Sequence, residues 1–178
     1  MNTDIKSKEI LSKLKSRDSA IVLQGIEKIR ESGNRYVLSE MIDLLHDTKQ
    51  IEIKKSILNL ISELKDKESI PVLIAAIQNE KYYDERTELV ACCWQNGLSY
   101  NVYLPVFIDL VINEVFLIAF EAFTVIENLY GNIDDQVIEN EILKIEEAMK
   151  TADEQKTYLL NGLLTIIRDI PEQLEFTE

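Results

Sequence analysis

The side chains best suited to catalysis or metal binding are few in this sequence. His46 is the only histidine, and the only two cysteines, Cys92 and Cys93, are adjacent to each other. A Ser-His-Asp or Cys-His arrangement would therefore have to use His46 or do without a histidine. Structural zinc needs four Cys or His ligands in pairs, and the sequence does not supply them. We expect no metal, no cofactor and no catalytic residue.

His46 and the two cysteines have simpler structural interpretations. His46 follows an apolar helical segment, so it is expected to cap the end of a helix or to face solvent. Free cysteine usually packs as a small apolar group, which is the expected role of Cys92 and Cys93, with Trp94 as a core or groove residue. The nearest basic residue is Arg86, and no Lys or Arg follows within a helical turn to lower a thiol pKa.

The charge balance narrows the choice of partner. The 178 residues include 19 Lys and Arg against 32 Asp and Glu, a net charge of −13. Such a chain repels nucleic acid and anionic membranes unless it has a basic face, and no such face is evident. A basic protein partner would instead be attracted. The charged segment at residues 1–9 lacks the apolar core of a secretory signal, and adjacent cysteines rarely pair, so we expect a cytoplasmic protein.

The positions of proline, glycine and apolar residues indicate an internal repeat. Pro71 and Pro105 are 34 residues apart, and so are Gly97 and Gly131. Segments aligned on this spacing each place four residues at i, i+3, i+4 and i+7, one face of a helix. Fifteen of these sixteen residues are apolar, the exception being Glu141. The four rows are Leu38, Met41, Ile42, Leu45; Ile70, Leu73, Ile74, Ile77; Leu104, Phe107, Ile108, Val111; and Ile138, Glu141, Ile142, Ile145.

Each row is preceded by a further expected helix. These helices span about Ser19–Ser32, Ile51–Lys65, Asp84–Asn96 and Glu114–Tyr130, with terminal helices at about 4–15 and 153–169. The last helix is expected to stop at Pro171. The segment Glu114–Tyr130 is apolar all round and is therefore expected to be covered on several sides. Asp134 is expected to cap the helix that follows it.

The stretch Leu58–Glu80 resembles a HEAT repeat of the short bacterial type. The resemblance lies in Leu-x-x-Ile at the end of one helix, an Asp-rich turn and then Ile-Pro-x-Leu-Ile, and Leu104–Ile108 partly repeats it. It implies an all-α fold, a right-handed α-α superhelix (HEAT/armadillo-like solenoid) of about four to five antiparallel helix pairs. Residues 1–178 would form a single domain with units at about 18–47, 51–79, 84–113 and 114–149. A plain helical bundle is the alternative.

HEAT-like families most often contain protein-binding scaffolds, so the resemblance implies a non-catalytic scaffold or inhibitor that holds a protein partner in a concave groove. The alternative is a HEAT-like enzyme or modifying factor, such as a chromophore lyase. The second helices would line the groove, and the middle of the surface that they form is unusually apolar. A basic, amphipathic partner segment would bind there unless the patch is buried against the terminal helices. The expected partner-binding residues are Val72, Ala75, Ala76, Val106 and Leu110, bordered by Asp43 and Asp109.

Overall fold

The computed structural model describes residues 2–32 and 37–174, with side chains described for 7–30 and 37–169. Every regular element in this part of the chain is a helix, which confirms the all-α prediction. The chain divides into two compact units, unit 1 (residues 1–98) and unit 2 (residues 99–178), and each is described by itself. The prediction of a single repeat domain stays a prediction.

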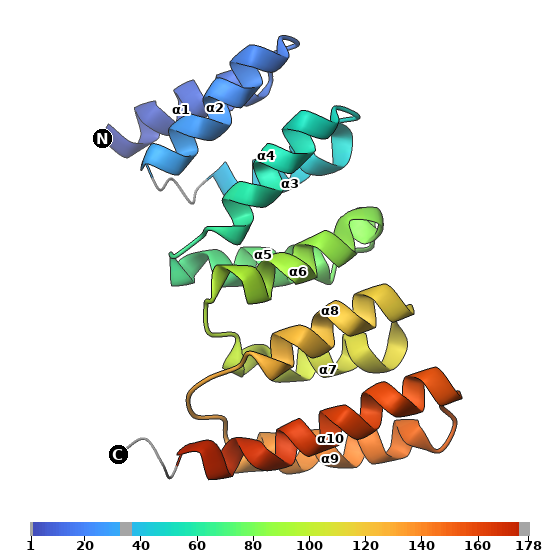
Figure 1. The fold of residues 1–178 in the computed structure, drawn as a ribbon. Coiled ribbons are helices and arrows are strands. Elements are labelled where there is room, and N and C mark those ends of the chain that lie inside the picture. The colour runs from blue at the N-terminus through green and yellow to red at the C-terminus, as the bar shows by residue number, and fades with distance from the viewer. Residues whose placement is uncertain (1, 33–36, 175–178) are drawn as a thin grey trace. The chain divides into compact units, whose positions relative to one another are not determined.

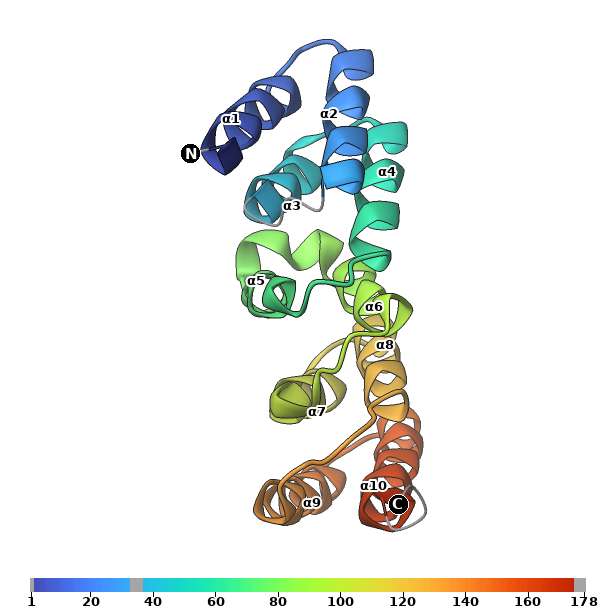
Figure 2. The ribbon, with the colours of Figure 1, turned by 90° about the vertical axis from the view of Figure 1, so that its left-hand side faces the viewer.

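Unit 1 consists of three helical hairpins in two layers. Helices α1, α3 and α5 form one layer and α2, α4 and α6 form the other, with each helix contacting its neighbours in its own layer (Figures 1 and 2). The elements are α1 (Asn2–Leu14), α2 (Ser19–Ser32), α3 (Leu38–Asp47), α4 (Ile51–Ser62), α5 (Ile70–Ile77) and α6 (Arg86–Asn96), with the 3-10 helices η2 (Lys67–Ser69) and η3 (Glu80–Glu85).

Unit 2 repeats this plan with two hairpins. Helix α7 packs on α9 and α8 packs on α10, while the hairpins are α7/α8 and α9/α10. The elements are η4 (Asn101–Tyr103), α7 (Leu104–Asn113), α8 (Phe116–Glu127), α9 (Asp135–Met149) and α10 (Glu154–Leu174). Hairpins α3/α4, α5/α6 and α7/α8 each join the second helix of one expected repeat to the first helix of the next, while α1/α2 and α9/α10 each include an expected terminal helix. Grouping the helices into the expected repeats or into the observed hairpins leaves their order along the chain the same.

The apolar rows form the cores of the two units in the predicted register. Fifteen of the sixteen row positions are buried, and the remaining one, Ile142, is partly exposed. Glu141 is buried like its apolar equivalents, with 7% of its surface exposed. Because a shift of one residue would rotate each helix by about 100°, this agreement confirms the phase of all four row helices.

Proline and glycine mark the helix ends that the repeat predicts. Pro71 and Pro105 lie in the first turns of α5 and α7, where a missing N–H costs no helical hydrogen bond. Gly97 ends α6 with φ +65°, a left-handed conformation that favours glycine. The side chain of Asp134 accepts hydrogen bonds from the amides of Gln136 (2.9 Å) and Val137 (3.3 Å), which confirms the predicted cap of α9.

One prediction about the helices of unit 2 is wrong, and another holds only in part. Helix α10 continues to Leu174 instead of ending at Pro171, because a proline removes one helical hydrogen bond without forbidding the turn that follows. Helix α8, expected to be covered on several sides, is contacted within unit 2 by α7 and α10. These contacts bury only part of its circumference, because Phe116, Leu117 and Phe120 are 41%, 65% and 47% exposed. In the described part of the chain, no helix is long and apolar enough to span a membrane.

Candidate functional site

Unit 1 carries a hollow between α3, α5 and η3, here called the α3/α5 groove. It encloses about 380 Å³. Three of the predicted partner-binding residues, Val72, Ala75 and Ala76, lie along it. The complete lining is Ser39 and Ile42 from α3, Pro71, Val72, Ala75 and Ala76 from α5, and Asn79 and Tyr82 beside them. The lining is therefore mostly apolar, with a polar group at each edge.

The sequence of α5 explains why this surface is hollow. The large side chains of the Ile-Pro-Val-Leu-Ile-Ala-Ala-Ile segment occupy its buried row, which leaves small residues on the opposite face. Ala75 is exposed and Val72 is partly exposed, as predicted. Ala76 is only 6% exposed, so the prediction that it faces solvent is wrong. Helix η3 packs against α5 and covers this part of the helix.

Asp43 lies beside the groove, where it mainly holds Tyr82, a residue of the groove lining, in place. The hydroxyl of Tyr82 donates a 2.8 Å hydrogen bond to Asp43 Oδ1, and the ammonium group of Lys81 bonds the same oxygen. The hydrogen bond from Lys81, and after it the one from Tyr82, lowers the pKa of Asp43. Asp43 therefore stays ionised and has a cationic partner, which reduces the acidic character that the sequence predicts for this border.

A second polar cluster joins α3, α4 and η3 next to Tyr82. Glu85 is 6% exposed, and its two carboxylate oxygens each lie 3.0 Å from a nitrogen, His46 Nδ1 and Lys54 Nζ. The ring of His46 stands edge-on to that of Tyr82, with centroids 5.8 Å apart. Burial alone would raise the pKa of Glu85, but the hydrogen bonds from His46 and Lys54 outweigh it and lower the pKa.

This cluster was missed at the sequence level, where His46 was expected to cap a helix or face solvent. Its residues are far apart in the chain, but Lys54 and Glu85 are separated by 31 residues, close to the repeat period. That separation is the only signal that could have paired them. A histidine held by a carboxylate occurs in nucleophilic triads, yet both cysteines of the chain lie on α6 and are buried.

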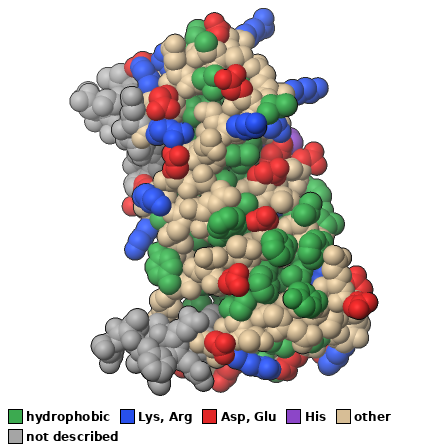
Figure 3. Space-filling view, in the orientation of Figure 1, with side chains coloured by type: hydrophobic (Ala, Val, Ile, Leu, Met, Phe, Trp, Pro, Cys, Tyr) green, Lys and Arg blue, Asp and Glu red, His purple; other side chains and the backbone are tan. Residues whose placement is uncertain are grey.

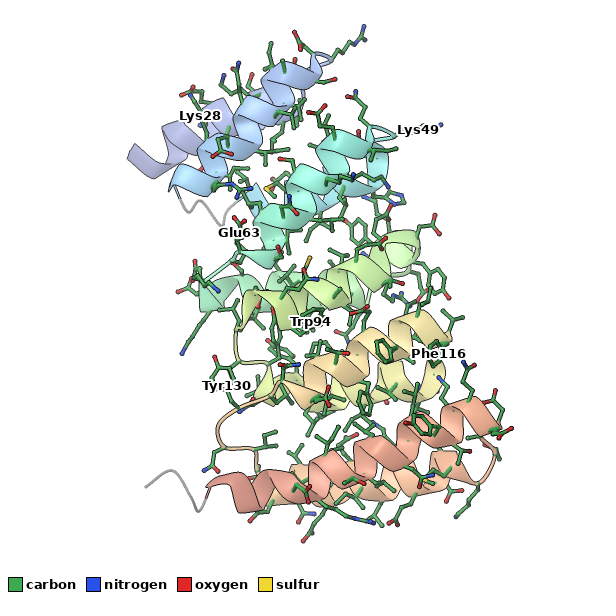
Figure 4. All side chains as sticks on the ribbon, viewed as in Figure 1. Lys28, Lys49, Glu63, Trp94, Phe116 and Tyr130 are labelled. Atoms are coloured by element: carbon green, nitrogen blue, oxygen red, sulfur yellow. The ribbon has the colours of Figure 1, made fainter. Side chains whose placement is uncertain are left out.

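The cysteines have the structural role predicted for them. The thiol of Cys92 donates to the carbonyl oxygen of Leu58 at 3.6 Å, and burial, with a smaller effect from Glu88, raises its pKa to about 12. Trp94, expected in the core or a groove, is 37% exposed on α6 (Figure 4). Among the described residues, no group of three or more His, Cys, Asp and Glu is placed to hold a metal ion.

The other predicted site residues lie on α7 in unit 2. Val106 is partly exposed and Asp109 is exposed, but Leu110 is only 8% exposed. The prediction that Leu110 faces solvent is wrong because α7 is contacted by α8, α9 and α10. Asp109 accepts an ion pair at 2.8 Å from Lys144, which also bonds the buried Glu141 at 3.1 Å. A continuous patch across α5 and α7 stays a prediction.

Neither a scan against models of protein families nor a search of curated proteins found a match for this chain. The function is therefore argued from the two units and their surfaces.

Proposed function

We propose that this protein is a non-catalytic, HEAT-type α-solenoid that holds a segment of a protein partner in the α3/α5 groove. The observation that carries the proposal is the groove itself, where small residues on the outward face of α5 leave an open, apolar hollow. Within each unit, the succession of antiparallel hairpins and the layered contacts support a solenoid-type array, and the HEAT resemblance implies that it is a right-handed superhelix. Solenoids of this kind use such surfaces to bind extended polypeptides.

The chemistry of the groove favours an amphipathic segment. Ala75 and Val72 permit close approach of a partner backbone. Burial of the partner's apolar side chains against this lining would contribute about 25 cal/mol of binding free energy per Å² of apolar surface. Unit 1 is almost neutral, with 15 basic and 16 acidic residues, so its charge gives little preference for a partner of either sign. Shape and apolar burial would therefore select the occupant of this groove.

The alternative, a HEAT-like enzyme such as a chromophore lyase, requires polar side chains that converge on a pocket. The groove has an apolar lining, and His46 is directed at Glu85, with which it forms a hydrogen bond. Asp43 and Tyr82 likewise bond each other. These contacts support a structural role for the polar cluster and a binding role for the groove.

Site-specific photo-crosslinking tests this proposal. A benzophenone amino acid at Ala75 should capture one discrete protein in cells, whereas the same probe at Ile51, 71% exposed in the same unit but outside the groove, should not. Adding Val72→Glu should abolish the adduct without changing the melting temperature. Equal adducts from both positions, no discrete adduct from Ala75, or an adduct that survives Val72→Glu would overturn the proposal.

A further inference from the structure

A second exposed apolar surface lies on unit 2, on the side opposite the buried face of α8. Phe116, Leu117 and Phe120 of α8 are 41%, 65% and 47% exposed, and Tyr158 of α10 is 81% exposed. We call these four residues the α8/α10 patch. Figure 3 shows hydrophobic side chains gathered over this part of unit 2, and Figure 4 places Phe116 at the start of α8.

Helix geometry places these four side chains near one another on unit 2. The rings of Phe116 and Phe120 stack with centroids 5.9 Å apart. Helices α8 and α10 lie side by side and run in the same direction (Figure 1). Gly162 of α10 allows a close approach, since a Cβ atom there would lie 3.2 Å from the ring of Phe123. Tyr158 is one turn before Gly162, and this places it level with the turn of α8 that carries Phe120.

The patch is not needed to build the core. The opposite face of α8 supplies the buried residues Ile118, Ala119, Ala122, Val125 and Ile126. Singly exposed apolar residues are normal on protein surfaces, but a contiguous group that includes two stacked aromatic rings is typical of an interaction site. Aromatic side chains, Phe among them, are also enriched at the cores of protein interfaces.

The charge of unit 2 indicates which partner fits this patch. Residues 99–178 contain 16 acidic and only 4 basic side chains, so nearly all of the chain's net charge of −13 lies here. Each of the four basic side chains is already engaged. Lys144 bonds Asp109 and Glu141, Lys150 bonds Glu147, Arg168 bonds Glu146, and Lys156 bonds the carbonyl oxygens of Val111 and Glu114.

We propose that the α8/α10 patch docks a basic, amphipathic helix of a protein partner. The apolar stripe of that helix would cover Phe116, Leu117 and Phe120, and its Lys and Arg residues would be attracted by the net negative charge of unit 2. The exposed rings also attract cations through their faces. A second copy of this chain fits less well, because it would bring two strongly acidic units together. This proposal does not depend on the α3/α5 groove.

The test uses the full chain and two synthetic helical peptides of 18 residues, one with a leucine face and a lysine face and the other with glutamate in place of lysine. The lysine peptide should bind at least about tenfold more tightly, a difference of about 1.4 kcal/mol or more. Its affinity should fall as the salt concentration rises. Equal binding of both peptides would overturn the predicted charge preference.

Matched variants separate the patch from the general acidity of unit 2. Leu117→Ser with Phe120→Ser should weaken binding of the lysine peptide about tenfold or more, and Leu143→Ser should not, although Leu143 is 65% exposed in the same unit. All these side chains are surface groups, so the melting temperatures should stay close to that of the wild type. An equal effect of both variants, or no effect of the double variant, would contradict the proposal.

Further outcomes identify a different occupant. If the protein forms a concentration-dependent dimer that is lost in Leu117→Ser/Phe120→Ser, a second copy of the chain covers the α8/α10 patch and the proposal is overturned. If the double variant shows faster amide exchange in residues 1–98, unit 1 of the same chain covers the patch, and the proposal is likewise overturned. Val72→Glu should leave peptide binding unchanged, so failure of the groove proposal and failure of this one are distinguishable.

Discussion

Residues 1–98 contain 15 basic and 16 acidic side chains, whereas residues 99–178 contain 4 and 16. Both units nevertheless form antiparallel hairpins in two layers, with apolar rows buried in the same register. The shared architecture of two units with such different charge indicates that the apolar pattern, and not the placement of charge, specifies this fold. Surface charge is therefore available for recognition, and unit 2 is the unit in which it is concentrated.

The two units share one pattern of ion pairs. In both units, ion pairs link successive hairpins at about one repeat of separation, as in Arg30–Glu63 and Lys54–Glu85 of unit 1 and Asp109–Lys144 of unit 2. In unit 2, Lys156 also caps the end of α7 by donating to the carbonyl oxygens of Val111 and Glu114, both at 2.7 Å.

The largest effect is expected from Phe107→Ala in unit 2. Phe107 is fully buried, and its ring packs edge-on against Tyr100 with centroids 5.7 Å apart. The loss of burial and the cavity should lower the free energy of unfolding by about 3–5 kcal/mol. Amide exchange should accelerate in residues 99–178 and remain unchanged in residues 1–98. A loss under about 1 kcal/mol in urea denaturation would place Phe107 outside the core.

Much of this core follows from the sequence because helical packing repeats every 3.6 residues. The row containing Phe107 is predicted, and so are its equivalents in α3 and α5, since each apolar position lies a turn from the next. The 34-residue spacing of Pro71 and Pro105 fixes where the row helices begin. These signals are local, and they are repeated along the chain, which makes them readable without a structure.

The parts that were missed depend on contacts between distant residues. Helix η3 has no apolar period, and Tyr82 is held over α5 by Asp43, which lies 39 residues earlier. Burial of Ala76 and of Leu110 follows from such neighbours and not from their own helices. The exposure of Phe116 depends on how many helices contact α8, and the composition of a helix does not show this.

The next largest effect concerns Glu85 in unit 1. Glu85→Gln should destabilise the protein by about 1.5–3 kcal/mol at pH 7, because it removes two charge-assisted hydrogen bonds. The lowered pKa of Glu85 means that its stabilisation is present above the unfolded value of about 4.3. It is lost as the pH falls through the folded pKa. The exposed Glu52→Gln variant is the control and should have little effect.

The wild type and Glu85→Gln should therefore converge in stability as the pH falls below about 4. Chemical denaturation at several pH values would measure this convergence. A difference that stays constant from pH 7 to pH 3 would show that the charge of Glu85 is not what stabilises unit 1.

Replacing Glu141, the buried carboxylate of unit 2, is expected to have a smaller effect on the free energy of unfolding, and in the direction of higher stability. Glu141 occupies a row position that is apolar in the other three rows, and it has Lys144 as its ionic partner. Glu141→Leu should leave stability unchanged or raise it by about 1 kcal/mol, because the desolvation penalty disappears. Lys144 keeps its ion pair with Asp109 at 2.8 Å, so no charge is left unpaired. A loss as large as that of Glu85→Gln would contradict this account.

The smallest effect, expected to be close to zero, is that of Phe107→Ala on the rate at which the two cysteines of unit 1 are chemically modified. Both lie on α6 and are buried, and burial raises the pKa of Cys92 to about 12, so its thiolate is scarce at pH 8. Modification by a thiol reagent must therefore wait for unit 1 to open. Leu73→Ala, which creates a cavity in unit 1, should accelerate modification, whereas Phe107→Ala should not change its rate. If Phe107→Ala accelerates modification as much as Leu73→Ala does, the two units open together and their different charges act on one cooperative structure.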